Sequence, residues 1–238
     1  LAAALVAFTP QFLFISASVS NDNMVTAVCA AGVWLSVALA CGQAAPRWGS
    51  LAALGLLVGL AALSKLSGLL LGPFALFCLG IAAWRRRAQG QSWRLLIGGG
   101  AVILGVAALV AGWWYWRNWQ LFGDPLGLSA MFAVGPARTE AASWAELVAL
   151  GPGVWRSAWA VFGWFNVLAP EWVYWLYTAL AALGLLGWGR ILFDAARRRG
   201  RLLSAGSPHF LAAALLTLWS LAIMAALGLQ SYRFSTSW

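Results

Sequence analysis

Charge is scarce in this sequence of 238 residues. Only 9% of the residues are Asp, Glu, Lys or Arg, whereas 63% are hydrophobic. A soluble domain carries about a quarter charged residues, so this chain lacks the polar surface that a water-soluble fold presents. Its apolar residues gather in runs of roughly 18 or more, long enough for a helix to cross a ~30 Å hydrocarbon core. We therefore predict an all-α fold, a polytopic bundle of transmembrane helices.

Metal-binding and nucleotide-binding signals are also missing. His209 is the only histidine, which excludes a multi-histidine metal site. Cys29, Cys41 and Cys78 lie in or beside apolar segments without Cys-x-x-Cys spacing, which favours buried core residues over a disulfide framework or a zinc site. The sequence has no Walker A loop, no Gly-x-Ser-x-Gly and no His-Glu-x-x-His. The sequence motifs therefore support neither nucleotide-driven transport nor hydrolysis of the kind that soluble enzymes carry out.

The apolar runs predict about seven membrane spans, which we treat as one transmembrane domain over residues 1–238. The chain begins at Leu1 without an initiator Met, and residues 1–18 lack the basic region and cleavage site of a signal peptide. We expect a fragment that lacks the N-terminal part of a longer protein. The predicted spans are Leu1–Ser18, Asp22–Cys41, Trp48–Leu63, Leu66–Trp84, Leu95–Trp116, Trp172–Phe193 and Phe210–Leu229.

The net charge of +9 belongs to short loops and does not indicate nucleic-acid binding. Basic runs at 85–87 and 197–201 separate apolar spans, as cytoplasmic loops do when they hold a topology. With these loops inside, ten Lys and Arg residues lie inside or beside the inner loops and five lie outside. The acids show the reverse bias, since only Asp194 is inside. We therefore expect residues 19–21, the turn at Lys65 and residues 117–171 to face outside.

The stretch 117–171 is predicted to be an extracytoplasmic loop with amphipathic helices. Ten of the 17 tryptophans lie between positions 113 and 175, partly as an aromatic belt at the membrane interface. Ser143 and Glu146 have the spacing of a capping box. A second helix would place Trp155, Trp159 and Phe162 at i, i+4 and i+7, a stripe suited to a helix lying in the interface.

Asn21 and Asp22, in "SVSND", stand at the outer start of a predicted span. The simpler interpretation is a helix N-cap by one of them. A carboxylate costs little at a membrane helix end compared with the bilayer centre. A functional role for Asp22 therefore needs a second polar feature at the same face.

Lys65, in "SKLSG", is the only lysine and divides the run from Trp48 to Trp84 into two short spans. One interpretation is a turn lysine that snorkels to the outer interface. The other is a fixed cation aimed at a phosphate group. The residues alone favour neither interpretation of Lys65 over the other.

Arg117, Asn118 and Asp124, in "WWYWRNWQLFGDPLG", follow the end of another span. The simpler interpretation is an anchored helix end followed by a Gly-Asp-Pro turn. Alternatively, Arg117 binds an anionic headgroup, because guanidinium matches phosphate oxygens bidentately. Asp124 would then orient a sugar hydroxyl or a cation.

Three motifs in this order resemble the GT-C membrane glycosyltransferases, a superfamily of polytopic enzymes. They are "PQFLFISASVSNDN", "GLAALSKLSGLLLGP" and "GWWYWRNWQLFGDPLG", and the bacterial branch related to protein O-mannosyltransferases and aminoarabinose–lipid A transferases is the most similar. The resemblance covers most of residues 1–127 and extends weakly beyond through "FGWFNVLAPEWVY".

The resemblance implies a membrane enzyme that transfers a sugar from a polyprenyl-phosphate donor to a lipid, glycan or protein acceptor at the extracytoplasmic face. It implies an integral protein of the bacterial inner membrane, in contact with membrane lipids. Asp22 corresponds to an accessory acid of the family, and Lys65, Arg117 and Asn118 correspond to its polar motif residues. Asn21 and Asp124, which lie beside these residues, are further candidates for substrate binding.

Two family features are missing. The principal acid of the first outer loop would lie upstream of Leu1, and the "G-R-Y-L-x-P" segment is not found. We therefore name no catalytic base here and expect residues 1–238 alone to be inactive. The cation requirement varies among such enzymes, so a divalent cation stays open, with Asp22 as the candidate ligand if one binds. Two rivals to the enzyme are a transporter or lipid-linked sugar flippase and a non-catalytic assembly subunit.

Overall fold

The computed structural model describes residues 2–87, 92–129, 142–163, 166–197 and 208–233. It divides into two compact units, each described here by itself. The first comprises Leu1–Ser20, Pro136–Phe210 and Gly228–Trp238, and the second comprises Asn21–Gly135 and Leu211–Leu227. The arginines at 198, 199 and 201 and the acid at 140 lie outside the described residues.

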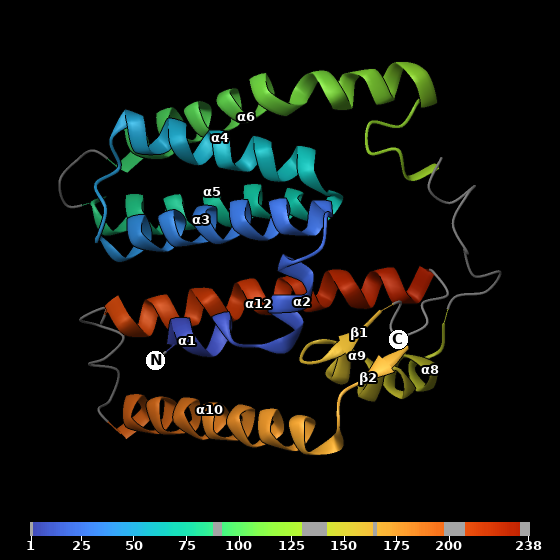
Figure 1. The fold of residues 1–238 in the computed structure, drawn as a ribbon. Coiled ribbons are helices and arrows are strands. Elements are labelled where there is room, and N and C mark those ends of the chain that lie inside the picture. Colours follow the sequence, from blue (N-terminus) through green and yellow to red (C-terminus); the bar gives the residue numbers. More distant parts are fainter. Residues whose placement is uncertain (1, 88–91, 130–141, 164–165, 198–207, 234–238) are drawn as a thin grey trace. The chain divides into compact units, whose positions relative to one another are not determined.

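The second unit is a helix bundle in which consecutive helices from α3 to α6 run antiparallel (Figure 1). Successive helices reverse direction, so the start of α3, the end of α4, the start of α5 and the end of α6 lie at one end of the bundle (Figure 1). A 3-10 helix, η1, joins α4 to α5, and the middle of α12 completes the unit. The elements are α3 (Asn21–Cys41), α4 (Trp48–Ser64), η1 (Leu66–Leu70), α5 (Leu71–Arg85), α6 (Ser92–Phe122) and α12 (Pro208–Arg233).

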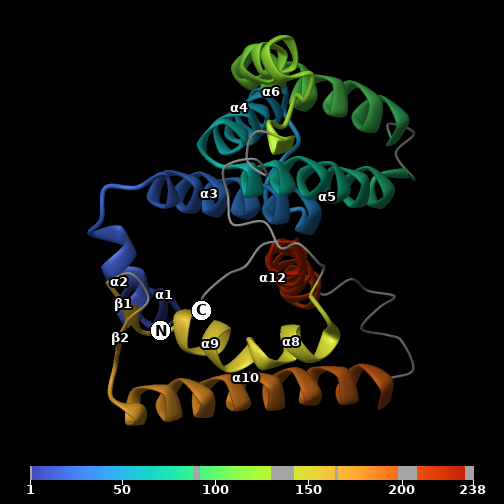
Figure 2. The ribbon, with the colours of Figure 1, turned by 90° about the vertical axis from the view of Figure 1, so that its right-hand side faces the viewer.

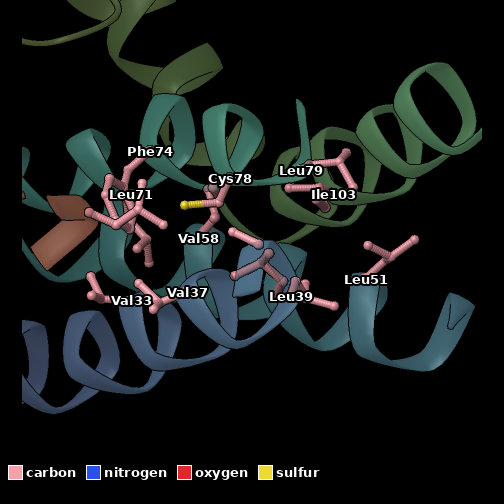
Figure 3. Close-up of a cluster of buried hydrophobic side chains, with 14 of the residues drawn as sticks. Val33, Val37, Leu39, Leu51, Val58, Leu71, Phe74, Cys78, Leu79 and Ile103 are labelled. Atoms are coloured by element: carbon pink, nitrogen blue, oxygen red, sulfur yellow. The ribbon is translucent and has the colours of Figure 1, made fainter. Parts of the chain in front are cut away.

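The core of this unit lies where α3, α4, α5 and α6 meet (Figure 3). Leu54, Leu71, Cys78, Leu79 and Ile103 are each fully buried. Apolar side chains that fill this space carry no unsatisfied polar atoms, and dispersion contacts between them hold the helices together where lipid removes the hydrophobic driving force.

Two glycines let α4 and α6 approach closely. A Cβ on Gly55 would stand 2.7 Å from the Ile103 carbonyl oxygen, and one on Gly59 would stand 2.7 Å from Val110 Cβ. Their four-residue spacing is the small-xxx-small pattern of packed membrane helices. This contact fixes the position of α6 against α4 along its length.

The first unit holds short helices, a hairpin and one long helix. The strands pair antiparallel, with Val161 opposite Leu168 and Phe162 opposite Val167. Helix α9 lies beside the first part of α10 in both views (Figures 1 and 2), and Trp155 Nε1 donates to the Thr178 hydroxyl at 3.1 Å. The elements are α1 (Ala2–Ala7), α2 (Pro10–Ser16), α8 (Trp144–Ala149), α9 (Gly151–Ser157), β1 (Val161–Phe162), β2 (Val167–Leu168) and α10 (Glu171–Arg197).

The structure confirms the all-α membrane fold and corrects one predicted span. Five helices in the described residues are long and apolar enough to cross a membrane, and a sixth apolar helix, Trp48–Ser64, has 17 residues. Residues 1–18, predicted as one span, instead contain the short helices α1 and α2. Pro10 explains the break, since proline lacks an N–H and disfavours helical backbone in the residue before it. Thr9 is accordingly extended.

Within residues 117–171, the predicted capping box is confirmed and the predicted aromatic stripe is wrong. The Ser143–Glu146 capping box forms, with a Glu146 carboxylate oxygen 2.7 Å from the Ser143 amide nitrogen. Helix α9, however, ends at Ser157, and Phe162 lies in β1. Tertiary contacts replace the helical stripe, because Trp159 stacks on Tyr177 with ring centroids 4.5 Å apart. Helix α6 also continues through Arg117 to Phe122, residues predicted to begin the loop.

Candidate functional site

Asp22 and Lys65 form an ion pair at one end of the bundle. Asp22 lies in the first turn of α3, and its carboxylate accepts a hydrogen bond from the Lys65 ammonium at the end of α4. The two side chains are 40% and 44% exposed respectively. The pair is therefore held in a fixed place while both groups remain open to solvent or a ligand. An exposed pair of this kind contributes little to stability, about 0–1 kcal/mol.

Asn21 makes a second bridge between the same two helix ends. Its side-chain amide Nδ2 donates to the Ser64 carbonyl oxygen at 3.1 Å. Ser64 is the last residue of α4, where carbonyl groups have no partner within the helix. Asn21 thus satisfies one of them and fixes the start of α3 beside Lys65.

Gly68 fixes the backbone that follows Lys65. A Cβ at this position would stand 2.1 Å from the Ala61 carbonyl oxygen, so only glycine allows η1 to lie this close to α4. Lys65 has extended backbone, with φ −160° and ψ 149°. The "SKLSG" motif therefore makes a tight corner that presents Lys65 at the turn between α4 and α5.

Helix lengths place the ion pair near the expected edge of the lipid. At about 1.5 Å per residue, the 17 residues of α4 span about 25 Å, less than the ~30 Å hydrocarbon core. The 31 residues of α6 span about 46 Å at the same rise. We therefore expect Lys65 to lie close to the boundary of the hydrocarbon, and the last turns of α6 continue beyond the contact between Tyr115 and the end of α4.

Arg117 and Asn118 lie in those last turns of α6. The Arg117 guanidinium lies over the Trp114 ring, 5.4 Å from its centroid, and its side chain is exposed. Asn118 is only 6% exposed, and its Nδ2 lies 3.4 Å from the Pro125 carbonyl oxygen. Arg117 can therefore reach a ligand, whereas Asn118 holds the turn that follows the helix.

Asp124 organises that turn. Its carboxylate accepts hydrogen bonds from the amide N–H groups of Leu126 and Ser129, both at 2.9 Å. The backbone N–H of Ser129, followed by that of Leu126, holds the pKa of the Asp124 carboxyl below its ordinary value of 3.8. Gly123 and Gly127 on either side have φ values of +65° and +69°, which favour glycine. These bonds give Asp124 a structural role in the Gly-Asp-Pro-Leu-Gly turn.

The six predicted residues therefore form two groups. Asn21, Asp22 and Lys65 are joined by contacts between α3 and the end of α4. Arg117, Asn118 and Asp124 lie at the end of α6 and in its turn, with the contacts described above. Within the described residues, no group of three or more His, Cys, Asp or Glu side chains could hold a metal ion. Asp22, the predicted metal candidate, is engaged with Lys65.

Two residues at this end were not predicted. Tyr115 donates from its hydroxyl to the Ala62 carbonyl oxygen at 2.7 Å, and the Ser64 hydroxyl donates to Leu60 at 2.7 Å. A tyrosine inside an otherwise apolar span is a usable signal, because its hydroxyl needs a partner when it is buried.

Comparison with known proteins links this site to a family. Residues 1–116 match the family model described as dolichyl-phosphate-mannose-protein mannosyltransferase. Neither a curated protein nor a solved structure matches the chain. The match includes Asn21, Asp22 and Lys65 and ends one residue before Arg117. It supports the same membrane glycosyltransferase superfamily that the three motifs resemble.

Proposed function

We propose that this protein, whose residues 1–116 match the family model described as dolichyl-phosphate-mannose-protein mannosyltransferase, is a GT-C membrane glycosyltransferase that transfers a sugar from a polyprenyl-phosphate donor to an extracytoplasmic acceptor. The acceptor would be a lipid, a glycan or a protein. The protein would act in the bacterial inner membrane, with its reactive face outside the cytoplasm. The main observation behind this proposal is the ion pair between Asp22 and Lys65, the only lysine in the sequence.

The chemistry explains why such a pair would serve the reaction. Transfer breaks the bond between the anomeric carbon and the phosphate oxygen and forms a bond from that carbon to the acceptor oxygen. The leaving polyprenyl phosphate gains negative charge as the bond breaks, and a fixed cation at that oxygen stabilises the transition state. Lys65 would supply this cation near the lipid boundary, where a membrane-bound phosphate lies.

Arg117 would bind an anionic headgroup at the end of α6. Its guanidinium is exposed, and it offers a bidentate donor set that matches phosphate oxygens. The neighbouring Trp114 ring restricts the guanidinium at 5.4 Å, so less conformational freedom is lost on binding. Asn118 and Asp124 would contribute by shaping the turn beside Arg117.

Asp22 would act as an accessory acid. Its carboxylate holds Lys65 and would orient an acceptor hydroxyl or a divalent cation in the complex. The proton lost by the acceptor must pass to a base, and we assign that base to none of residues 1–238. Asp22 is therefore proposed to act electrostatically and not to take that proton.

A transporter or flippase is the rival function. It would need polar groups inside several spans to carry a hydrophilic headgroup across. Among the described residues, the buried polar side chains are Ser36, Asn118 and Ser231, and the Ser36 hydroxyl bonds back to Gly32 in its own helix at 2.7 Å. These observations favour transfer at one face over passage through the bundle.

The test uses the full-length protein in proteoliposomes with polyprenyl phosphate that carries a radiolabelled sugar, together with cell-envelope membranes as the acceptor source. We expect the label to move to the acceptor fraction with release of polyprenyl phosphate. Lys65→Ala should lower this rate by about 10²-fold, as loss of one preorganised electrostatic contact does. Glu171→Gln, which removes the Arg156–Glu171 ion pair, is the matched control and should retain activity. Label that crosses the bilayer with its donor intact would instead show transport.

A further inference from the structure

The end of α4 is held by side chains from two other helices. Helix α4 ends at Ser64, and its last carbonyl groups have no partner within the helix. The Lys65 amide N–H reaches the Ala61 carbonyl at 3.2 Å, and Asn21 reaches that of Ser64. The carbonyl between them in the sequence, at Ala62, accepts the Tyr115 hydroxyl at 2.7 Å. Near a membrane few waters can replace such a partner, which makes each of these bonds important.

Tyr115 connects α6 to the end of α4 that precedes Lys65. Its hydroxyl binds α4 three residues before Lys65, and its backbone lies two residues before Arg117 on α6. The ring is partly buried, so the bond is shielded from bulk water. Below this contact, Gly55 and Gly59 already hold α4 close to α6. The Tyr115 bond thus fixes the last turn of α4 against the turn of α6 that carries Arg117.

We propose that Tyr115 is a positioning residue, whose hydrogen bond to the Ala62 carbonyl holds the last turn of α4, and with it Lys65, in place for a lipid-linked phosphate. This inference rests on the proposed function, because it needs Lys65 to contact the phosphate. It adds the residue that sets the position of Lys65. Misplacement of this cation weakens an interaction that depends on preorganised geometry.

The test is a double-mutant cycle in the full-length protein, with sugar transfer from the polyprenyl-phosphate donor as the readout. Tyr115→Phe keeps the ring and removes the hydroxyl. We expect kcat/KM for the donor to fall about threefold to tenfold, the range that one net hydrogen bond supplies. In a Lys65→Ala background the same substitution should change kcat/KM by less than about twofold, because coupled residues are not additive.

Trp113→Phe is the matched control. It removes another aromatic donor from the same part of α6, the Trp113 Nε1 bond to the Val110 carbonyl at 3.0 Å, which stays within one helix. This variant should keep kcat/KM within about twofold of wild type. Melting curves of all variants in detergent show that the comparison concerns folded protein.

Each outcome is decisive. An equal loss from Tyr115→Phe with and without Lys65 would overturn the proposal, since it would show a general effect on packing. No loss in either background would also overturn it, while leaving the function of Lys65 intact. If Lys65→Ala itself retains full activity, the proposed function fails first, and the inference fails with it.

Discussion

The two ends of the α3–α6 bundle carry different kinds of charge. One end carries both signs, with Asp22 and Lys65 paired and Asp124 bound within a turn. The described residues at the other end carry cations alone, at positions 47, 85, 86, 87 and 94. There, Arg87 lies over the Trp84 ring at 4.1 Å. Cations alone suit the retention of a loop in the cytoplasm, whereas fixed opposite charges suit the recognition of a polar ligand.

Neutralising Asp22 should produce the largest difference between the two ends. Asp22→Asn retains hydrogen-bonding capacity but removes the charge, so we expect sugar transfer to fall by about 10²-fold. The melting temperature should change little, because the pair is exposed and contributes about 0–1 kcal/mol. Turnover and melting of the full-length protein are measured together, with Asp22→Ala alongside.

Glu171→Gln controls for the loss of an ion pair as such, since Arg156 and Glu171 lie 2.9 Å apart in the other described ion pair. If Asp22→Asn shows wild-type turnover, Asp22 serves only as a residue at the start of α3. A melting loss shared by Asp22→Asn and Asp22→Ala would assign the carboxylate to folding.

Substitution of Gly68 should have the next largest effect, on stability. Gly68→Ala places a Cβ 2.1 Å from the Ala61 carbonyl oxygen, and we expect a loss of about 1–3 kcal/mol from overpacking. Gly80→Ala is the matched control, because nothing lies within 4 Å of its Cβ position in α5. That change should be neutral or stabilise by up to about 1 kcal/mol. Thermal melting in detergent distinguishes them, and equal melting would contradict the tight corner at Lys65.

Replacing Arg117 should have a smaller effect on transfer. Arg117→Lys keeps the charge but loses the bidentate fork, so we expect KM for the donor to rise by about tenfold, as for one charge-assisted hydrogen bond. Arg87→Lys, at the opposite end of the bundle, retains a cation at position 87; it is the control and should leave KM unchanged. Equal KM values for wild type and Arg117→Lys would remove Arg117 from the phosphate site.

The smallest effect concerns the pH dependence of the Asp124 turn. Because hydrogen bonds lower the pKa of this carboxyl in the folded protein, its contribution to stability is present above the ordinary value of 3.8 and is lost as the pH falls through the lower folded value. The amide resonances of Leu126 and Ser129 should titrate with a midpoint below 3.8. Asp124→Asn should abolish this titration. A midpoint at or above 3.8 would contradict the hydrogen bonds that the Asp124 carboxylate accepts in the turn.

The sequence allowed the long spans and the α8 capping box to be predicted, because both depend on local pattern. It could not reveal the Asp22–Lys65 pair, whose members are 43 residues apart and meet only when α3 and α4 pack. The prediction of a helical stripe formed by Trp155, Trp159 and Phe162 was wrong for a related reason. Trp159 stacks on Tyr177 of another helix, and this tertiary contact outweighs the helical spacing that the sequence suggests.

The central claim is that the end with both charges faces the outside of the cell, and thiol labelling tests it most directly. In a background without Cys29, Cys41 and Cys78, cysteine replaces Leu126 in the turn after α6 or Gln43 in the turn after α3, both exposed positions. An impermeant maleimide added to intact cells should label Leu126→Cys and should label Gln43→Cys only after the membrane is opened. Labelling of Gln43→Cys alone in intact cells would contradict the orientation and the site proposed on it.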